Sequence, residues 1–320
     1  MTELSPQERI AEKLRRVIET HDLSETLRSQ AEKSLERLEA PVRIAFMGPA
    51  NSGQPQVINS LLGSDLLLAK GPRPVQELIF GEEDRVTLTR ADGSVHEQFG
   101  LPEPEAVQSA AFVQRRCDAP VLRQYSVLDL VIGGSPEQMR GAVRWAARKA
   151  DIAVWCSRSF TAPERQFWQS VPERLMDHAF LLLTQDPTGG GAARMKQALA
   201  GEFLDVLSVP AAAKAASMDD PDLRDEALRS LIAALDRHTA EGRRADAESA
   251  LMFLKKHEVR RSAATVSTAE ESKESQGAKI VSFGNAAGSQ EKAAEIEAET
   301  LPRDQTAIRG ACAYIREQAY

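Results

Sequence analysis

Short apolar runs alternate with amphipathic stretches through the middle of the chain. Four of these runs, 42–47, 127–132, 152–156 and 179–184, have the length and composition of buried strands. The stretches between them carry apolar residues at helical spacing. Strands that are apolar throughout are buried on both faces, and their alternation with helices is typical of a sheet covered on both sides. The pattern therefore predicts an α/β fold with a mostly parallel, doubly wound sheet.

Helical patterns flank this central region on both sides. Apolar residues recur at helical spacing within 5–39 and again within 221–261, and we expect these helices to pack together as an accessory bundle. The composition then turns to Ser, Ala, Glu, Gly and Gln, which is typical of disorder. The expected divisions are N-terminal helices (1–40), the α/β domain (41–215), a C-terminal helical segment (216–261), a disordered acidic tail (262–300) and a short terminal helix (301–320).

The segment after the first helix of the α/β region is less regular. The pattern of residues 75–80 and 85–90 is typical of the two strands of a hairpin, and the turn signal Asp92-Gly93 follows them. The stretch 100–125 contains three prolines. We therefore expect a hairpin first, and then a loop or short helix.

Charge and cysteine content exclude several classes of protein. The 320 residues include 40 Lys and Arg against 47 Asp and Glu, a net charge of −7, which is the wrong sign for a general nucleic-acid coat. The three cysteines are far apart in the sequence and form no CxxC pair, so neither a disulfide scaffold nor a metal site is expected. A membrane-spanning helix needs about 18–20 apolar residues, and no stretch of the sequence approaches that length. A cytoplasmic location is expected, with membrane contact that is at most peripheral.

A strand, a glycine loop and a helix follow one another in 42–63, which reads VRIAFMGPANSGQPQVINSLLG. The strand leads into Gly48, and Gly53 follows after four residues. Such a framework cradles nucleotide phosphates, because glycines let N–H groups turn inward and the helix dipole favours anions. A working loop of the pattern GxxxxGK[ST] also supplies a Lys for the phosphates and a hydroxyl for Mg²⁺. Here those positions hold Gln54 and Pro55, so the Walker A motif is degenerate.

The run GPANSGQPQVINSLLGSDLL resembles the motif of the dynamin-like GTPase family, of the bacterial type, in which Asn-Ser-Gly-Lys precedes a helix reading roughly Leu-Ile-Asn-Ala-Leu-Leu-Gly. The resemblance covers 41–210 and includes Gly-Pro-Arg-Pro at 71–74, where the family's first switch begins. It implies a P-loop GTPase-like fold and, in working members, GTP and Mg²⁺ as ligands. The residues that carry the match are Asn51, Ser52, Gly53, Ile58, Asn59, Leu61, Leu62 and Gly63.

Two later motifs of the family are also altered. The resemblance places the switch threonine, which would bind Mg²⁺, at Val75 or Gln76, and neither side chain has a hydroxyl. Asp129 fits the acid of the Asp-x-x-Gly motif, but Ile132 stands at the glycine position. Because the other Mg²⁺ ligands are missing, Asp129 is open to a second interpretation as a solvated or helix-capping carboxylate.

The base-reading motif is altered in the same way. Thr184 begins it, but its Lys is missing and the acid, Asp186, is displaced by one position. Because Asp186 precedes a proline and a glycine run, it also fits a turn. Gly48 and Gly53 have a similar alternative, since a tight strand-to-helix turn in an unrelated α/β fold would use them too.

These losses together favour a catalytically inactive pseudo-GTPase that acts as a protein-interaction, regulatory or scaffold module. The family resemblance implies that the partner is an active dynamin-like GTPase or a second copy of the chain, and no cofactor is expected. The alternative is a non-standard nucleotide-binding protein or weak GTPase with peripheral membrane association, in which Arg73 or Lys70 supplies the missing charge for GTP and Mg²⁺. The vestigial nucleotide-binding residues are predicted to be Gly48, Asn51, Ser52, Gly53, Gln54, Pro55, Gln76, Asp129, Thr184 and Asp186.

Overall fold

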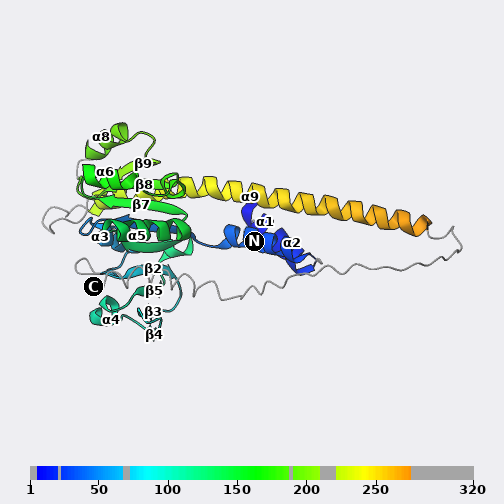
Figure 1. The fold of residues 1–320 in the computed structure, drawn as a ribbon, viewed down its shortest axis with the longest axis horizontal. Helices are drawn as coiled ribbons and strands as arrows, with labels where there is room; N and C mark the ends of the chain where they lie inside the picture. Colours follow the sequence, from blue (N-terminus) through cyan, green and yellow to red (C-terminus); the bar gives the residue numbers. More distant parts are fainter. Residues whose placement is uncertain (1–5, 21–22, 68–72, 187–189, 210–220, 275–320) are drawn as a thin grey trace, which may run out of the picture. The chain divides into compact units, whose positions relative to one another are not determined.

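The computed structural model describes residues 6–20, 23–67, 73–186, 190–209 and 221–274 (Figure 1). By contacts, the chain divides into two compact units, with one boundary between Ala40 and Pro41 and the other inside the last described helix, between His238 and Thr239. Each unit is described below by itself.

A nine-stranded mixed sheet forms the centre of the larger unit, in the order β4-β3-β5-β2-β6-β1-β7-β8-β9. The pairs β1–β6, β1–β7, β2–β5, β7–β8 and β8–β9 are parallel, and three pairs are antiparallel. The mostly parallel α/β fold predicted from the sequence is therefore confirmed. The strands are β1 (Val42–Gly48), β2 (Val75–Phe80), β3 (Arg85–Thr89), β4 (Val95–Phe99), β5 (Phe112–Cys117), β6 (Tyr125–Val131), β7 (Ile152–Ser157), β8 (Ala179–Leu183) and β9 (Asp205–Ser208).

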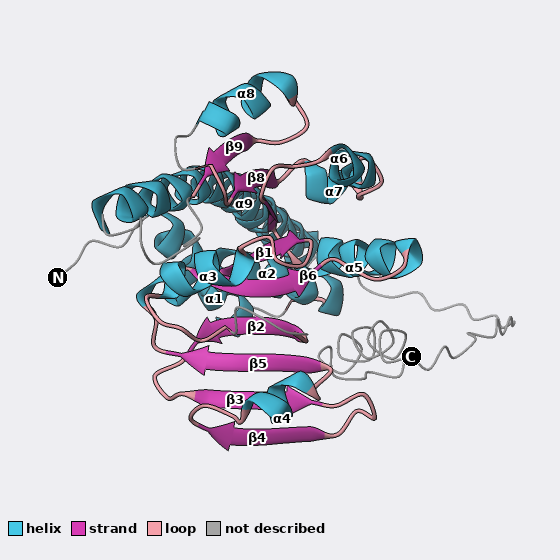
Figure 2. Cartoon of the chain, turned by 90° about the vertical axis from the view of Figure 1, so that its left-hand side faces the viewer, coloured by secondary structure: helices cyan, strands magenta, loops and turns pink. Residues whose placement is uncertain are grey.

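Helices cover both faces of this sheet (Figure 2). One buried cluster joins the sheet to α5, α6, α7 and α8, and a second joins its other face to α3, the 3₁₀ helix η1 and the first part of α9. The helices of this unit are α3 (Gln54–Leu62), α4 (Pro104–Gln108), η1 (Pro120–Arg123), α5 (Pro136–Lys149), α6 (Ala162–Trp168), α7 (Glu173–Met176) and α8 (Gly190–Ala198), and α9 (Pro221–Glu274) begins in it.

The central strands are apolar because both of their faces are buried. Every residue of β7 and of β8 is buried, as the uninterrupted apolar runs predicted. Polar side chains inside this core therefore need partners, and several of them gather where β1 and β6 end.

The smaller unit is a bundle of α1 (Pro6–Thr20), α2 (Glu25–Glu39) and the later part of α9. The guanidinium of Arg243, on α9, donates to the carbonyl oxygens of Leu38 and Ala40, which end α2. Helices from the two ends of the sequence thus pack together, as expected. Their shared core contains Ala11, Leu14, Ala31, Leu38, Ala247, Ala250 and Leu254.

The C-terminal part of the chain differs in one respect from what the sequence predicted, and part of it lies outside the described residues. The α9 helix continues to Glu274, past residue 261, where the helical segment was expected to end. A stretch rich in Ala and Glu favours helix when a preceding turn is already formed. The rest of the expected tail and the expected helix at 301–320 lie outside the described residues, as does Cys312. None of the helices in the described ranges is long and apolar enough to cross a bilayer.

The predicted pairing of 75–80 with 85–90 is wrong. The strand β2 pairs with β5 and β6, while β3 pairs with β4 and β5. The hairpin is β3–β4, and its turn is the Asp92-Gly93 signal, with Gly93 at a φ of 86°. The strand β5, which lies between β2 and β3, is not evident in the sequence because the segment FVQRRC contains polar residues that are typical of a loop.

Candidate functional site

The loop between β1 and α3 requires a glycine at its first position. A Cβ at Gly48 would lie 2.1 Å from the backbone carbonyl oxygen of Cys156 on β7, so no other residue fits without moving the backbone. Gly53 caps the helix with a φ of 83°, and Asn51 also has a positive φ of 63°. Glycine, and to a lesser degree asparagine, adopts this left-handed conformation at low cost. The backbone shape of a phosphate loop is therefore present.

Two neighbouring segments hold this loop in place. The hydroxyl of Thr184, at the end of β8, donates to the carbonyl oxygen of Ser52 and is also 3.2 Å from that of Ser157. Arg158 donates from Nε to the carbonyl oxygen of Asn51 at 3.0 Å. Thr184 is fully buried, so its hydrogen bond is shielded from water. These contacts within the protein fix the loop.

Some of the N–H groups that would face a phosphate are removed. The N–H of Ser52 donates to the carbonyl oxygen of Pro49 at 3.2 Å. Pro55 lies in the first turn of α3 and has no N–H at all. A phosphate in the loop would therefore lose two of its backbone donors in addition to the Lys.

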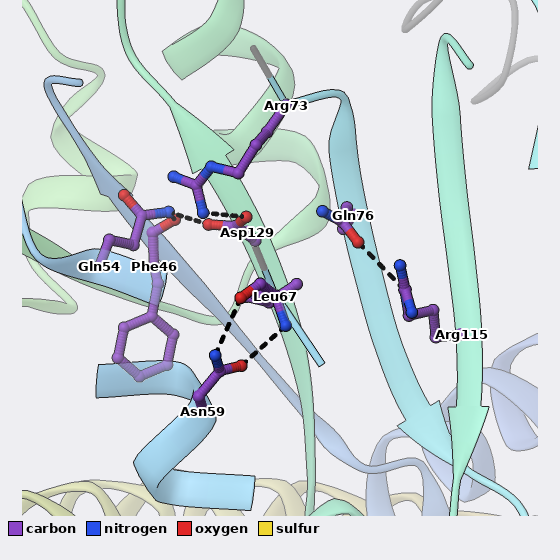
Figure 3. A network of polar contacts seen from close by, with 8 residues as sticks. All are labelled: Phe46, Gln54, Asn59, Leu67, Arg73, Gln76, Arg115 and Asp129. Atoms are coloured by element: carbon purple, nitrogen blue, oxygen red, sulfur yellow. Dashed lines mark hydrogen bonds and ion pairs between the residues drawn. The ribbon is translucent and has the colours of Figure 1, made fainter. Parts of the chain in front are cut away.

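The side chain of Gln54 points into the protein and is fully buried (Figure 3). Its Nε2 donates to the carbonyl oxygen of Phe46 at 2.8 Å and to Oδ1 of Asp129. Both amide hydrogens are thereby used within the protein. Its Oε1 is enclosed and has no partner among the described residues, and the neutral amide offers no positive charge to a phosphate.

Asp129, near the end of β6, is the centre of this network. Nη1 of Arg73 lies 3.0 Å from Oδ2 of Asp129, and the two side chains are 7% and 0% exposed. Burial raises the pKa of Asp129 to about 6, whereas the charge of Arg73 and the hydrogen bond from Gln54 act in the opposite direction. The carboxyl group at the centre of the site therefore already has a cation of the same chain as its partner.

The residues around Asp129 do not fit a GTP–Mg²⁺ complex. Gln76 pairs with Asp129 across β2 and β6, but its Oε1 accepts from Nε of Arg115 at 3.2 Å and it offers no hydroxyl. Pro55 replaces the other hydroxyl ligand of Mg²⁺. In the part of the chain that the structure describes, no three His, Cys, Asp or Glu side chains are grouped so that they could hold a metal ion.

Asp186 lies apart from this network. Its Oδ2 accepts from the backbone N–H of Ala192 at 2.7 Å, in the first turn of α8, and its carboxyl group lies against Gly191. A carboxylate at a helix N-terminus is stabilised by the helix dipole. The turn interpretation of Asp186 therefore describes its position better than a base-reading role does.

Asn59, which matches the family motif, has a structural position. Its side chain donates from Nδ2 to the carbonyl oxygen of Leu67 at 2.9 Å and accepts from the N–H of Leu67 at 2.8 Å. This pair of bonds fixes the chain after α3 (Figure 3). Nothing in this geometry requires a nucleotide.

The structure brings Gln54 and Asp129 together, and Thr184 holds the loop from the end of β8. Two arginines have positions that the sequence reasoning missed. The sequence suggests Arg73 only as a group that could reach a phosphate, and its pairing with Asp129 cannot be inferred from spacing. Arg115 lies in the segment that was expected to be a loop. In the structure Val113, Arg115 and Cys117 are buried in alternation, but the charged residue at the middle position hides this pattern in the sequence.

Comparisons with known proteins give distant likenesses. Neither a protein-family model nor a curated protein matches the chain. Two solved structures of an oligomerised bacterial dynamin pair, described as providing a mechanism for long-range sensing and tethering of membranes, align with TM-scores of 0.49 and 0.48 at 18% and 16% identity. They cover 80% and 76% of this chain but only 43% and 42% of their own, so the chain spans less than half of their length. Era from Aquifex aeolicus, bound to GDP and AlF4⁻, aligns with a TM-score of 0.31 at 12% identity over 53% of this chain and 50% of its own.

Proposed function

We propose that this chain is a catalytically inactive, dynamin-like pseudo-GTPase that acts as an interaction, regulatory or scaffold module in the cytoplasm. The observation that carries the proposal is the position of Asp129, which is bound on one side by Gln54 and on the other by Arg73. The groups that would position Mg²⁺ and the γ-phosphate are thus replaced by contacts within the protein.

Phosphoryl transfer depends on positioning and on charge neutralisation. In this chain Gln54 supplies no charge, and Arg73 is held by Asp129. The base-reading position Asp186 caps α8 instead. Each loss alone would lower the rate, and together they support the inactivity that we propose.

The binding role is supported by the free edge of the sheet. The strand β4 ends the sheet, and Val95 and Phe99 on it, with Leu101 just after it, are 58%, 69% and 73% exposed. An exposed apolar edge strand is a site where another chain can pair. The partner that we propose is an active dynamin-like relative or a second copy of the chain.

A phosphate-release assay with GTP and Mg²⁺ tests the proposal. We expect release at the buffer background for the wild type and also for the variant Gln54→Lys/Pro55→Ser, because the later motifs stay altered. Release above background that disappears in Asp129→Asn would overturn the proposal. Light scattering after size exclusion, together with mass spectrometry of co-purified proteins, then separates self-association from a distinct partner.

The alternative is a nucleotide-binding protein in which Arg73 supplies the positive charge. It requires Arg73 to leave Asp129, which would strand a buried carboxylate. Lys70, the other residue considered for this role, lies outside the described residues. Nucleotide binding that is lost in Arg73→Met but kept in a control variant at an exposed arginine would support the alternative.

A further inference from the structure

Arg115 is a buried arginine in the middle of β5. It is 5% exposed, and its register partner on β2 is Leu78, a member of the core on the α3 side of the sheet. Because paired residues of neighbouring strands share a face, Arg115 points to the same side as Gln76 and Asp129. Figure 3 shows Arg115 beside Gln76 and Asp129 on the other side of it.

No carboxylate among the described residues balances the charge of Arg115. Its one hydrogen bond in those ranges runs from Nε to Oε1 of Gln76, and the ion pairs found there do not include it. Burial lowers the pKa of Arg115, and the group that opposes this effect is the thiol of Cys117. Burial raises the pKa of Cys117 to about 11, so that thiol is uncharged near neutral pH. A guanidinium without a counter-ion at this depth is costly.

Arg115 contrasts with Arg73, the other buried arginine of this region. Arg73 has an internal carboxylate at 3.0 Å, and Arg115 has only a neutral amide. Asp129 is the ion-pair partner of Arg73 alone, and no ion pair among the described residues includes Arg115. Arg115 is therefore a buried positive charge on the α3 side of β5 without a counter-charge among the described residues.

The side chains of Arg115 and Gln76 have donors that no described residue uses. A guanidinium has five N–H donors, and Arg115 uses only the one on Nε. None of its nitrogens is among the fully enclosed polar atoms without a partner, and the same holds for the amide nitrogen of Gln76. The Nη groups of Arg115 and the Nε2 of Gln76 are therefore not completely enclosed by the described residues, although the two residues are only 5% and 1% exposed. Both groups are hydrogen-bond donors, and an anion can accept hydrogen bonds from them.

We propose that Arg115, together with Gln76, forms an oxyanion-binding site on the β2–β5 side of the sheet, for a phosphate or carboxylate group. A guanidinium fork binds both groups through two parallel N–H bonds, and the bound anion would supply the missing counter-charge. The site is separate from the loop between β1 and α3 and goes beyond the function proposed above. It does not depend on whether that loop binds GTP.

The test is thermal unfolding of the full chain in chloride, phosphate and acetate at equal ionic strength. The variant is Arg115→Met, and the matched control is Arg116→Met, at the exposed next residue of the same strand. We expect phosphate or acetate to raise the Tm of the wild type and of Arg116→Met by ~3 °C over chloride, in a saturable way. Arg115→Met should show no such rise. A response to one anion alone identifies which oxyanion the site takes.

A second measurement protects the test against a variant that is simply unstable. In chloride, Arg115→Met should unfold within ~2 °C of the wild type, because removing an unpaired buried charge offsets the lost bond to Gln76. The result that overturns the proposal is a Tm of the wild type that does not distinguish phosphate and acetate from chloride. An equal rise in Arg115→Met would overturn it as well, since the anions would then act elsewhere.

Discussion

Replacing Arg73 by methionine should destabilise the protein strongly, and more so at high pH. The side chains of Arg73 and Asp129 are 7% and 0% exposed, so the change leaves a carboxylate without a partner in the core. Removing one partner of a buried ion pair costs ~3–5 kcal/mol. We therefore expect Arg73→Met to lower the free energy of unfolding by about this amount at pH 8.

The pH dependence follows from the pKa of Asp129, which folding raises from 3.8 to about 6. A carboxyl group of this kind stabilises the fold fully below pH 3.8, and that contribution is lost as the pH rises through 6. Without Arg73 the pKa of Asp129 should rise further, since its largest opposing influence is gone. At about pH 5 Asp129 is mostly protonated in both proteins, so the loss should be several-fold smaller there.

Urea unfolding at about pH 5 and pH 8 measures both quantities. The variant Arg73→Met/Asp129→Asn should recover most of the stability at the higher pH, because no buried charge is left unpaired. An exposed pair provides the control: Arg16 and Glu12 are 71% and 51% exposed, and Arg16→Met should cost less than ~1 kcal/mol. A loss below ~0.5 kcal/mol for Arg73→Met, equal at both pH values, would show that Arg73 does not neutralise a buried carboxylate of Asp129.

Three further changes have defined outcomes. Asp129→Asn should remove the decrease in the free energy of unfolding that the wild type shows between about pH 4 and pH 7. That decrease is on the order of 3 kcal/mol for a pKa shift of this size, and urea unfolding across the range measures it. Gly48→Ala should destabilise the protein by several kcal/mol and lower the Tm, because the added Cβ meets the carbonyl group of Cys156. The control Gly133→Ala should change the Tm little, because its Cβ would have nothing within 4 Å. Equal effects would contradict the close approach of Gly48 to β7. Thr184→Val should cost ~1–3 kcal/mol by leaving the carbonyl oxygen of Ser52 without this donor, since the carbonyl oxygen of Ser157 keeps the backbone N–H of Thr184. An unchanged free energy of unfolding would show that the hydroxyl does not hold the loop.

The fold was predictable where one kind of pattern dominates. The strands β1, β6, β7 and β8 are buried on both faces, so their apolar runs identified them directly. The edge of the sheet was harder, because β4 is exposed along most of its length and β5 carries Gln114, Arg115 and Arg116. Strand pairing between β2 and β5 joins residues far apart in sequence, and local pattern does not encode such contacts.

The candidate site was predictable in its residues but not in its bonds. The loop motif identified Gln54, and the strand end identified Asp129. Their contact depends on the direction of a buried side chain at the start of α3, which spacing does not give. Arg73 illustrates the same limit, since its sequence neighbourhood suggested a switch and the structure gives it a buried carboxylate partner.

Titration with a fluorescent GTP analogue in the presence of Mg²⁺ tests the proposal that the loop between β1 and α3 does not bind a nucleotide. The burial of Gln54 against Phe46 and the pairing of Arg73 with Asp129 predict no saturable change in fluorescence up to millimolar protein or analogue. Saturable binding in the micromolar range that unlabelled GTP competes away would show that the protein still binds a nucleotide.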